Sequence, residues 1–249
     1  MKDPIIVYAR GLWSHQDAVN WIIQKTAEAT GLEVIDFDYS EELVQDVSNK
    51  TYLNRAKEKY GDEVIAKNRD IIYMGHSHGA ALGIVFNKMC VSKKMILSAP
   101  GIRPFGVVRR IPNALKKDYV PHYVIKNSNE VSTRMEYFKE NFNLIRDFSR
   151  VFYVGTEAKK SIDSIKSDTL FIQGTKDEFV NVGTNLKLFD KIKLPTYQQE
   201  ISTEGPHKQI IIIPGGEHAI FEEVKNKGKD NEEAIYETLF AEVENFTRR

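Results

Sequence analysis

Residues 71–83 read Ile-Ile-Tyr-Met-Gly-His-Ser-His-Gly-Ala-Ala-Leu-Gly, and this stretch decides the fold. Its first four residues are apolar throughout, which is typical of a short strand buried on both faces. The small and apolar residues from Gly79 onward predict a helix that opens directly after the turn. A strand, a tight turn and a helix in such close succession indicate an α/β protein.

The turn itself, Gly75-His76-Ser77-His78-Gly79, is a Gly-x-Ser-x-Gly pattern. Between a strand and a helix this pattern predicts a nucleophile elbow, in which a strained backbone lifts the serine hydroxyl clear of the sheet. Side chains at positions 75 and 79 would collide with neighbouring backbone, so glycine is needed there. Ser77 is therefore the candidate nucleophile. The alternative is an ordinary turn in which Ser77 only caps the following helix.

Similar short apolar runs recur along the chain and alternate with helical patterns. Because these runs are apolar throughout, they predict parallel strands covered by helices on both faces. We expect a three-layer αβα sandwich around a mostly parallel sheet of about six strands. The predicted strands are 5–8, 32–37, 71–74, 95–97, 169–172 and 210–213.

One long segment interrupts this alternation. Residues 102–166 contain helical stretches but no convincing buried strand. A structureless loop of that length would be unusual, so we predict a helical cap or lid. The core domain would then comprise residues 1–101 and 167–249.

Composition narrows the function classes. Lys plus Arg and Asp plus Glu both number 35, so the chain lacks the basic excess of a nucleic-acid binder. The single cysteine, Cys90, can form neither an internal disulfide nor a cysteine-rich metal site. No apolar run is long enough to span a bilayer or to form a signal-peptide core. We therefore expect a cytoplasmic protein that needs no metal or cofactor.

A serine nucleophile needs a base, and the base needs an acid that orients it. Asp177 follows the predicted strand 169–172 and would lie at the carboxyl edge of the sheet, where functional groups of open α/β sheets gather. It is the candidate acid, although its neighbour Glu178 stays an alternative. An ordinary turn or cap residue is the non-functional interpretation of Asp177.

His218 is the candidate base. It follows the last predicted strand on a glycine-rich loop, so it has the chain order serine, acid, histidine and lies at the same edge. His207 precedes that strand and would lie at the opposite edge. His76 and His78 flank Ser77, and their side chains should point away from its hydroxyl.

An oxyanion hole needs two backbone donors. One should be the N–H of His78, the residue after the nucleophile. The other should come from the loop after the first strand, where we choose Leu12, with Gly11 allowing the loop to fold back.

These motifs together resemble the α/β-hydrolase-fold serine hydrolases, a superfamily of esterases, lipases and thioesterases. The resemblance covers nearly the whole chain: residues 75–79 match the elbow, 174–180 the acid loop and 216–218 the histidine loop. Family members commonly carry His-Gly where this chain has Arg10-Gly11, but the expected donor of this loop is a backbone N–H and does not depend on that side chain. The resemblance also implies a lid after the fourth strand.

The sequence thus predicts a serine hydrolase that cleaves a carboxylic ester or thioester of a small acyl substrate. His218 would take the proton of Ser77, and Asp177 would stabilise the charged imidazole. Two alternatives stay open: an acyltransferase that uses the same three residues, and a binding module that keeps the fold without activity.

Overall fold

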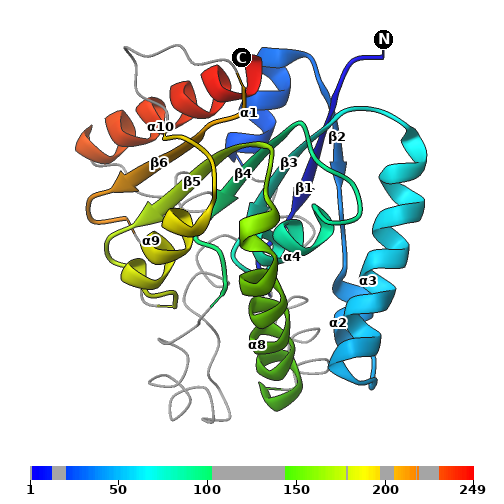
Figure 1. Cartoon of the computed structure of the whole chain (residues 1–249). Coiled ribbons are helices and arrows are strands. Elements are labelled where there is room, and N and C mark those ends of the chain that lie inside the picture. The colour runs from blue at the N-terminus through cyan, green and yellow to red at the C-terminus, as the bar shows by residue number, and fades with distance from the viewer. Residues whose placement is uncertain are drawn as a thin grey trace, which may run out of the picture.

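The computed structural model describes residues 2–12, 21–102, 144–177, 179–196, 205–216, 218 and 230–249. Six strands form one sheet in the order β2-β1-β3-β4-β5-β6, and every neighbouring pair is parallel. Figure 1 shows the sheet between two layers of helices. This arrangement confirms the predicted three-layer αβα architecture. The strands are β1 (Ile5–Ala9), β2 (Glu33–Asp36), β3 (Ile71–His76), β4 (Lys94–Ser98), β5 (Asp168–Gly174) and β6 (Lys208–Ile213).

The central strands β1, β3, β4 and β5 are buried along nearly their whole length because both of their faces are covered. Side chains alternate between the faces, so Ile5 and Val7 of β1 enter one core cluster while Ile6 and Tyr8 enter the other. The same alternation divides β3, β4 and β5. Each predicted strand corresponds to an observed one, with ends that differ by a few residues.

The face of the sheet that carries Ile6 and Tyr8 is covered, among the described residues, by two helices: α1 (Trp21–Thr30) and α10 (Asp230–Arg248). Ile22 and Ile23 of α1 and Leu239 and Val243 of α10 pack against the sheet there. Gly31 follows α1 with a φ of 69°, the left-handed conformation in which glycine commonly ends a helix.

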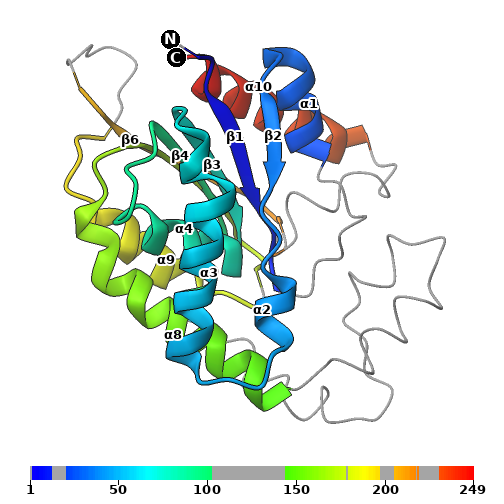
Figure 2. The same ribbon diagram turned by 90° about the vertical axis from the view of Figure 1, so that its right-hand side faces the viewer.

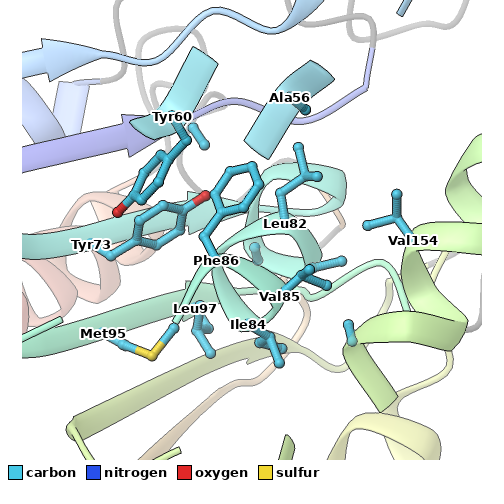
Figure 3. Close-up of a cluster of buried hydrophobic side chains, with 14 of the residues drawn as sticks. Ala56, Tyr60, Tyr73, Leu82, Ile84, Val85, Phe86, Met95, Leu97 and Val154 are labelled. Atoms are coloured by element: carbon cyan, nitrogen blue, oxygen red, sulfur yellow. The ribbon is translucent and has the colours of Figure 1, made fainter. Parts of the chain in front are cut away.

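The other face has a larger and more aromatic cover, made by helices that Figures 1 and 2 show on one side of the sheet. Figure 3 shows how Tyr60, Tyr73 and Phe86 fill the space between helices and sheet. The Tyr60 and Phe86 rings stack with centroids 4.4 Å apart. The helices of this face are α2 (Ser40–Val44), α3 (Asn49–Glu63), α4 (His78–Phe86), α8 (Leu144–Ser161) and α9 (Val182–Lys191), with short 3-10 turns η1 (Ile65–Lys67) and η2 (Ile162–Ser164).

Helix α8 belongs by its contacts to this helical layer, although it lies within the segment predicted as a lid. Val151, Val154 and Ala158 are buried in the core cluster of this face. Gly155 brings α8 so close to the chain after β4 that a Cβ there would lie 2.7 Å from the carbonyl oxygen of Ile102. Residues 103–143 lie outside the described residues, so the lid stays a prediction. None of the described helices is long and apolar enough to cross a membrane.

Candidate active site

Ser77 lies in a strained turn between β3 and α4. Its φ of 52° and ψ of −114° are unusual for any residue other than glycine, and such a conformation costs about 1–3 kcal/mol. The end of β4 and the loop after it both bond to its backbone. The N–H of Ser77 donates to the carbonyl oxygen of Ser98 (2.9 Å), and the N–H of Gly101 donates to the carbonyl oxygen of Ser77 (2.9 Å).

The two glycines of the pattern are required by close backbone contacts. A Cβ on Gly75 would lie 2.7 Å from the Cα of Ala80, and a Cβ on Gly79 would lie 2.2 Å from the carbonyl oxygen of Ala9. Neither contact could be relieved by moving a flexible side chain, since both involve backbone atoms. The steric reason inferred from the sequence for both glycines therefore holds.

The structure brings Ser77, His218 and Asp177 into one hydrogen-bonded chain. His218 Nε2 lies 2.9 Å from Ser77 Oγ, while its Nδ1 lies 2.9 and 3.0 Å from the two carboxyl oxygens of Asp177. The three residues follow β3, β6 and β5, and they meet at the carboxyl ends of these strands. The Asp177 side chain is fully buried, whereas 13% of the His218 side chain is exposed.

Asp177 is held as an anion by its hydrogen bonds. Burial raises the pKa of its carboxyl, but His218 and the bonds to the carboxylate outweigh burial and leave the pKa below its ordinary value. The backbone N–H groups of Phe179 and Val180 donate to Oδ1 at 2.9 and 2.8 Å. Because an ionised carboxylate only accepts, Nδ1 of His218 carries a proton and Nε2 is free to accept the hydroxyl proton of Ser77.

Sequence reasoning missed the side chains that hold this aspartate from behind. Gln173 Nε2 donates to Asp177 Oδ2 (3.0 Å), and Asn185 Nδ2 donates to Gln173 Oε1 (2.7 Å). Gln173 lies within β5 and Asn185 within α9, and both are buried. A polar residue in an otherwise apolar buried strand is a signal that could have identified Gln173.

The two histidines beside Ser77 point to different surroundings, and neither bonds to its hydroxyl. His76 packs against the His218 ring, with centroids 4.9 Å apart, and lies 3.4 Å from Ser98 Oγ through Nδ1. His78 points into the core instead, where its Nε2 meets the hydroxyl of Tyr52 at 2.8 Å. Burial is the main cause that lowers the pKa of both to about 3, with smaller contributions from the neighbouring His218 ring for His76 and from the Arg150 guanidinium for His78.

The predicted oxyanion loop packs against the start of α4. The carbonyl oxygens of Ala9 and Arg10 line the space where a Cβ on Gly79 would lie, and Leu12 is buried in the adjoining core. The side chain of Arg10, next to Gly11 in this loop, pairs with Asp36 at the end of β2. The roles of Leu12 and His78 as donors stay predictions. Glu178, the alternative acid, lies outside the described residues.

The comparisons with known proteins agree with this architecture. No family model matches the sequence, and no curated protein sequence is significantly similar to it. Solved structures do match: a monoacylglycerol lipase from Paleococcus ferrophilus superposes with a TM-score of 0.60 at 15% identity, over 97% of this chain and 94% of that one. A soluble variant of monoglyceride lipase from Saccharomyces cerevisiae gives 0.63 at 13% identity, over 98% and 86%.

A third match is the 2-hydroxy-6-oxo-6-phenylhexa-2,4-dienoate hydrolase from Rhodococcus, with a TM-score of 0.62 at 14% identity. It covers 99% of this chain and 91% of that one. At such low identity the likeness bears on the backbone arrangement alone. The six-stranded parallel sheet, the turn at Ser77 and these superpositions lead to one conclusion: the chain has the α/β-hydrolase fold.

Proposed function

We propose that this protein is a serine hydrolase that cleaves a carboxylic ester or thioester through an acyl-enzyme on Ser77. One observation carries the proposal, namely the hydrogen-bonded chain from Ser77 Oγ through His218 to a buried, ionised Asp177. Ser77 is also held in a strained backbone conformation at the carboxyl end of β3. Strain of this kind persists where the surrounding structure enforces it, and it is common at active sites.

In the proposed reaction, Ser77 Oγ attacks the acyl carbonyl carbon while His218 Nε2 takes the hydroxyl proton. Asp177 keeps the His218 ring in the required tautomer and stabilises the imidazolium that forms. The backbone N–H groups of His78 and Leu12 would bind the oxyanion. His218 then gives its proton to the leaving alcohol or thiol, and a water molecule, activated in the same way, releases the acid.

The choice of esters as the substrate class rests on proteins that share this fold. Two of the superposed proteins are a monoacylglycerol lipase and a monoglyceride lipase, which by their names act on glycerol esters. We extend to this chain only the broader class of acyl esters and thioesters. The identity of the acyl group would be set by the surfaces above Ser77.

A fluorophosphonate probe tests the proposal, because it reacts with an activated serine and leaves ordinary hydroxyls unmodified. We expect wild-type protein to take up one label, located at Ser77 by peptide mass spectrometry, and Ser77→Ala to take up none. Ser161→Ala is the matched control, since the Ser161 hydroxyl bonds only to the carbonyl oxygen of Glu157 in its own helix. An unlabelled wild type would contradict the hydrolase proposal. Label retained by Ser77→Ala would contradict the choice of nucleophile.

Substrate panels then define the reaction. We expect turnover of p-nitrophenyl esters or acyl thioesters of at least one chain length, abolished in Ser77→Ala. Adding acceptor alcohols separates a hydrolase from an acyltransferase, because a transferase would form the new ester in preference to the free acid.

A further inference from the structure

A cluster of three buried rings lies beneath the elbow, on the side of the sheet that α3 and α4 cover. It consists of Tyr39, which precedes α2, Tyr52 of α3, and His78, the first residue of α4. The His78 ring lies 5.4 Å from the Tyr39 ring and 6.1 Å from the Tyr52 ring, centroid to centroid. All three side chains are buried, so the two tyrosine hydroxyls and His78 Nε2 depend on one another or on the backbone for hydrogen bonds.

Tyr52 contacts the residue whose backbone N–H is the first predicted oxyanion donor. Its hydroxyl lies 2.8 Å from His78 Nε2, and the two rings stack with an angle of 23° between them. The guanidinium of Arg150 also lies over the Tyr52 ring, 5.0 Å from its centroid. Arg150 is itself fixed by hydrogen bonds to the carbonyl oxygens of Gln45 and Val47. The Tyr52 ring therefore has little freedom to shift.

Tyr39 contacts the loop that carries the second predicted donor. Its hydroxyl donates to the carbonyl oxygen of Arg10 at 2.7 Å, two residues before Leu12. The side chain of Arg10 is held at the same time by Asp36. The backbone of Arg10 also lies against Gly79, where a Cβ would come within 2.3 Å of its carbonyl oxygen. Tyr39 thus fixes the position of the loop relative to the first turn of α4.

From these contacts we infer that Tyr39 and Tyr52 are positioning residues of the oxyanion hole, one for each backbone donor. The inference rests on the proposed function and adds residues that do not touch the substrate. Donors must lie within about 2.7–3.1 Å of the developing oxyanion, and misplacement of about 1 Å can cost about a hundredfold in rate. Tyr52 sets the His78 N–H through the His78 ring, and Tyr39 sets the Leu12 N–H through the Arg10 carbonyl.

Three tyrosine-to-phenylalanine variants test the inference, since each removes one hydroxyl and keeps the ring. Tyr39→Phe and Tyr52→Phe remove the two bonds described above. Tyr60→Phe is the matched control, because Tyr60 is equally buried in the same core and its ring stacks on Phe86. For each variant kcat and KM are measured with a p-nitrophenyl ester, together with inhibition by a trifluoromethyl ketone, whose adduct with serine carries an oxyanion. Activity is normalised to the fraction of Ser77 that a fluorophosphonate labels at completion.

We expect kcat to fall between about tenfold and a hundredfold in Tyr39→Phe and Tyr52→Phe, with KM within about twofold of wild type. The inhibition constant of the ketone should rise by a similar factor, because the adduct uses the same donors. Tyr60→Phe should leave all three quantities within about twofold.

Two results would overturn the inference while leaving the hydrolase proposal intact. One is an active wild type with unchanged kcat in both variants. The other is a loss of kcat in Tyr60→Phe equal to that in the two variants, which would indicate a general effect of core hydroxyls. A wild type whose Ser77 takes no fluorophosphonate label would instead remove the proposed function and the inference together.

Discussion

The two ends of the parallel strands both bury charged side chains, yet they use them differently. At the carboxyl ends, Asp177 is fully buried and bonds to His218, which in turn reaches Ser77. At the amino ends, Lys94 and Lys208 open β4 and β6 and are also buried. A buried charge alone therefore does not mark the candidate active site of this molecule.

The amino-end lysines close the ends of two helices. Lys94 Nζ donates to the carbonyl oxygens of Phe246 (2.7 Å) and Thr247 (3.1 Å) in the last turn of α10. Lys208 Nζ donates to those of Phe189 (3.1 Å) and Ile192 (3.0 Å) at the end of α9. The last carbonyl groups of a helix lack partners within it and carry partial negative charge, so an ammonium group is a fitting partner.

The difference lies in the partners. Each lysine bonds to backbone carbonyls, which neither titrate nor react, so these contacts end within the scaffold. The carboxyl-end contacts run from side chain to side chain and end on a hydroxyl in a strained residue. A charge network that terminates on a nucleophile is what general-base chemistry requires.

The largest expected effect comes from two aspartates at opposite ends of β5. Asp177→Asn should lower kcat about 10⁴-fold, because an amide no longer enforces the tautomer in which Nε2 of His218 accepts the serine proton. Asp168→Asn is the matched control: Asp168 accepts a hydrogen bond from the N–H of His207 at the amino end (2.7 Å). We expect its kcat to stay within about twofold of wild type.

The comparison is made by measuring kcat for ester hydrolysis with both variants and wild type. Circular dichroism verifies that each variant is folded. Equal kcat for Asp177→Asn and wild type would mean that the carboxyl-end network is structural, like the amino-end one. Glu178 would then become the acid to examine.

Lys94→Met should show the reverse pattern at the amino end. Methionine keeps the buried stem but leaves two helix carbonyls without their donor, which costs about 1–3 kcal/mol of unfolding free energy. Burial lowers the pKa of Lys94 to about 8, so the desolvated ammonium offsets part of its own contribution. Urea unfolding measures the loss, and kcat at a temperature where the variant is folded should equal that of wild type. A drop in kcat without a drop in stability would contradict the division between the two ends.

The sequence was most informative where one local pattern determines the structure. The apolar strands, the turn at Ser77 and the order serine, acid, histidine all follow from residues close together in the chain or from the rule that parallel strands share a carboxyl edge. Gln173, the packing of His76 on His218 and the contact of Tyr52 with His78 depend on which side chains meet across the fold. No periodicity encodes such contacts, and the same is true of the buried lysines.

The burial of the His76 and His78 side chains also has a measurable consequence for stability. Both have a pKa near 3 in the folded protein, chiefly because burial disfavours the charged ring. In the unfolded chain a histidine takes up its proton near pH 6.5. Between these values the unfolded state binds more protons, so the free energy of unfolding falls as the pH is lowered from about 6.5 to 3.

A pair of variants isolates the contribution of His78. In His78→Phe the loss of stability between pH 7 and pH 5 should shrink by about 1–2 kcal/mol, because one buried titrating group is gone. Tyr52→Phe removes the same hydrogen bond but keeps the histidine, so its pH dependence should match wild type. Urea unfolding of all three proteins at both pH values gives the difference in unfolding free energy between each variant and wild type at pH 7 and at pH 5. Parallel pH profiles for wild type and His78→Phe would show that this ring is not held neutral.

The smallest effect concerns a residue at the carboxyl end that should be purely structural. Asn181 caps α9 by accepting the N–H of Thr184 through Oδ1 (3.0 Å), only four residues after Asp177. Asn181→Ala should lower the unfolding free energy by about 1 kcal/mol, and Asn181→Asp should restore it, since a carboxylate accepts the same hydrogen bond. The kcat of both should equal that of wild type, because the cap does not reach the chain of Ser77, His218 and Asp177. If Asn181→Ala instead lost as much activity as Asp177→Asn, then activity would depend on being near Asp177 and not on bonding to it. Hydrogen bonding between side chains would then not explain why the two ends of the strands differ.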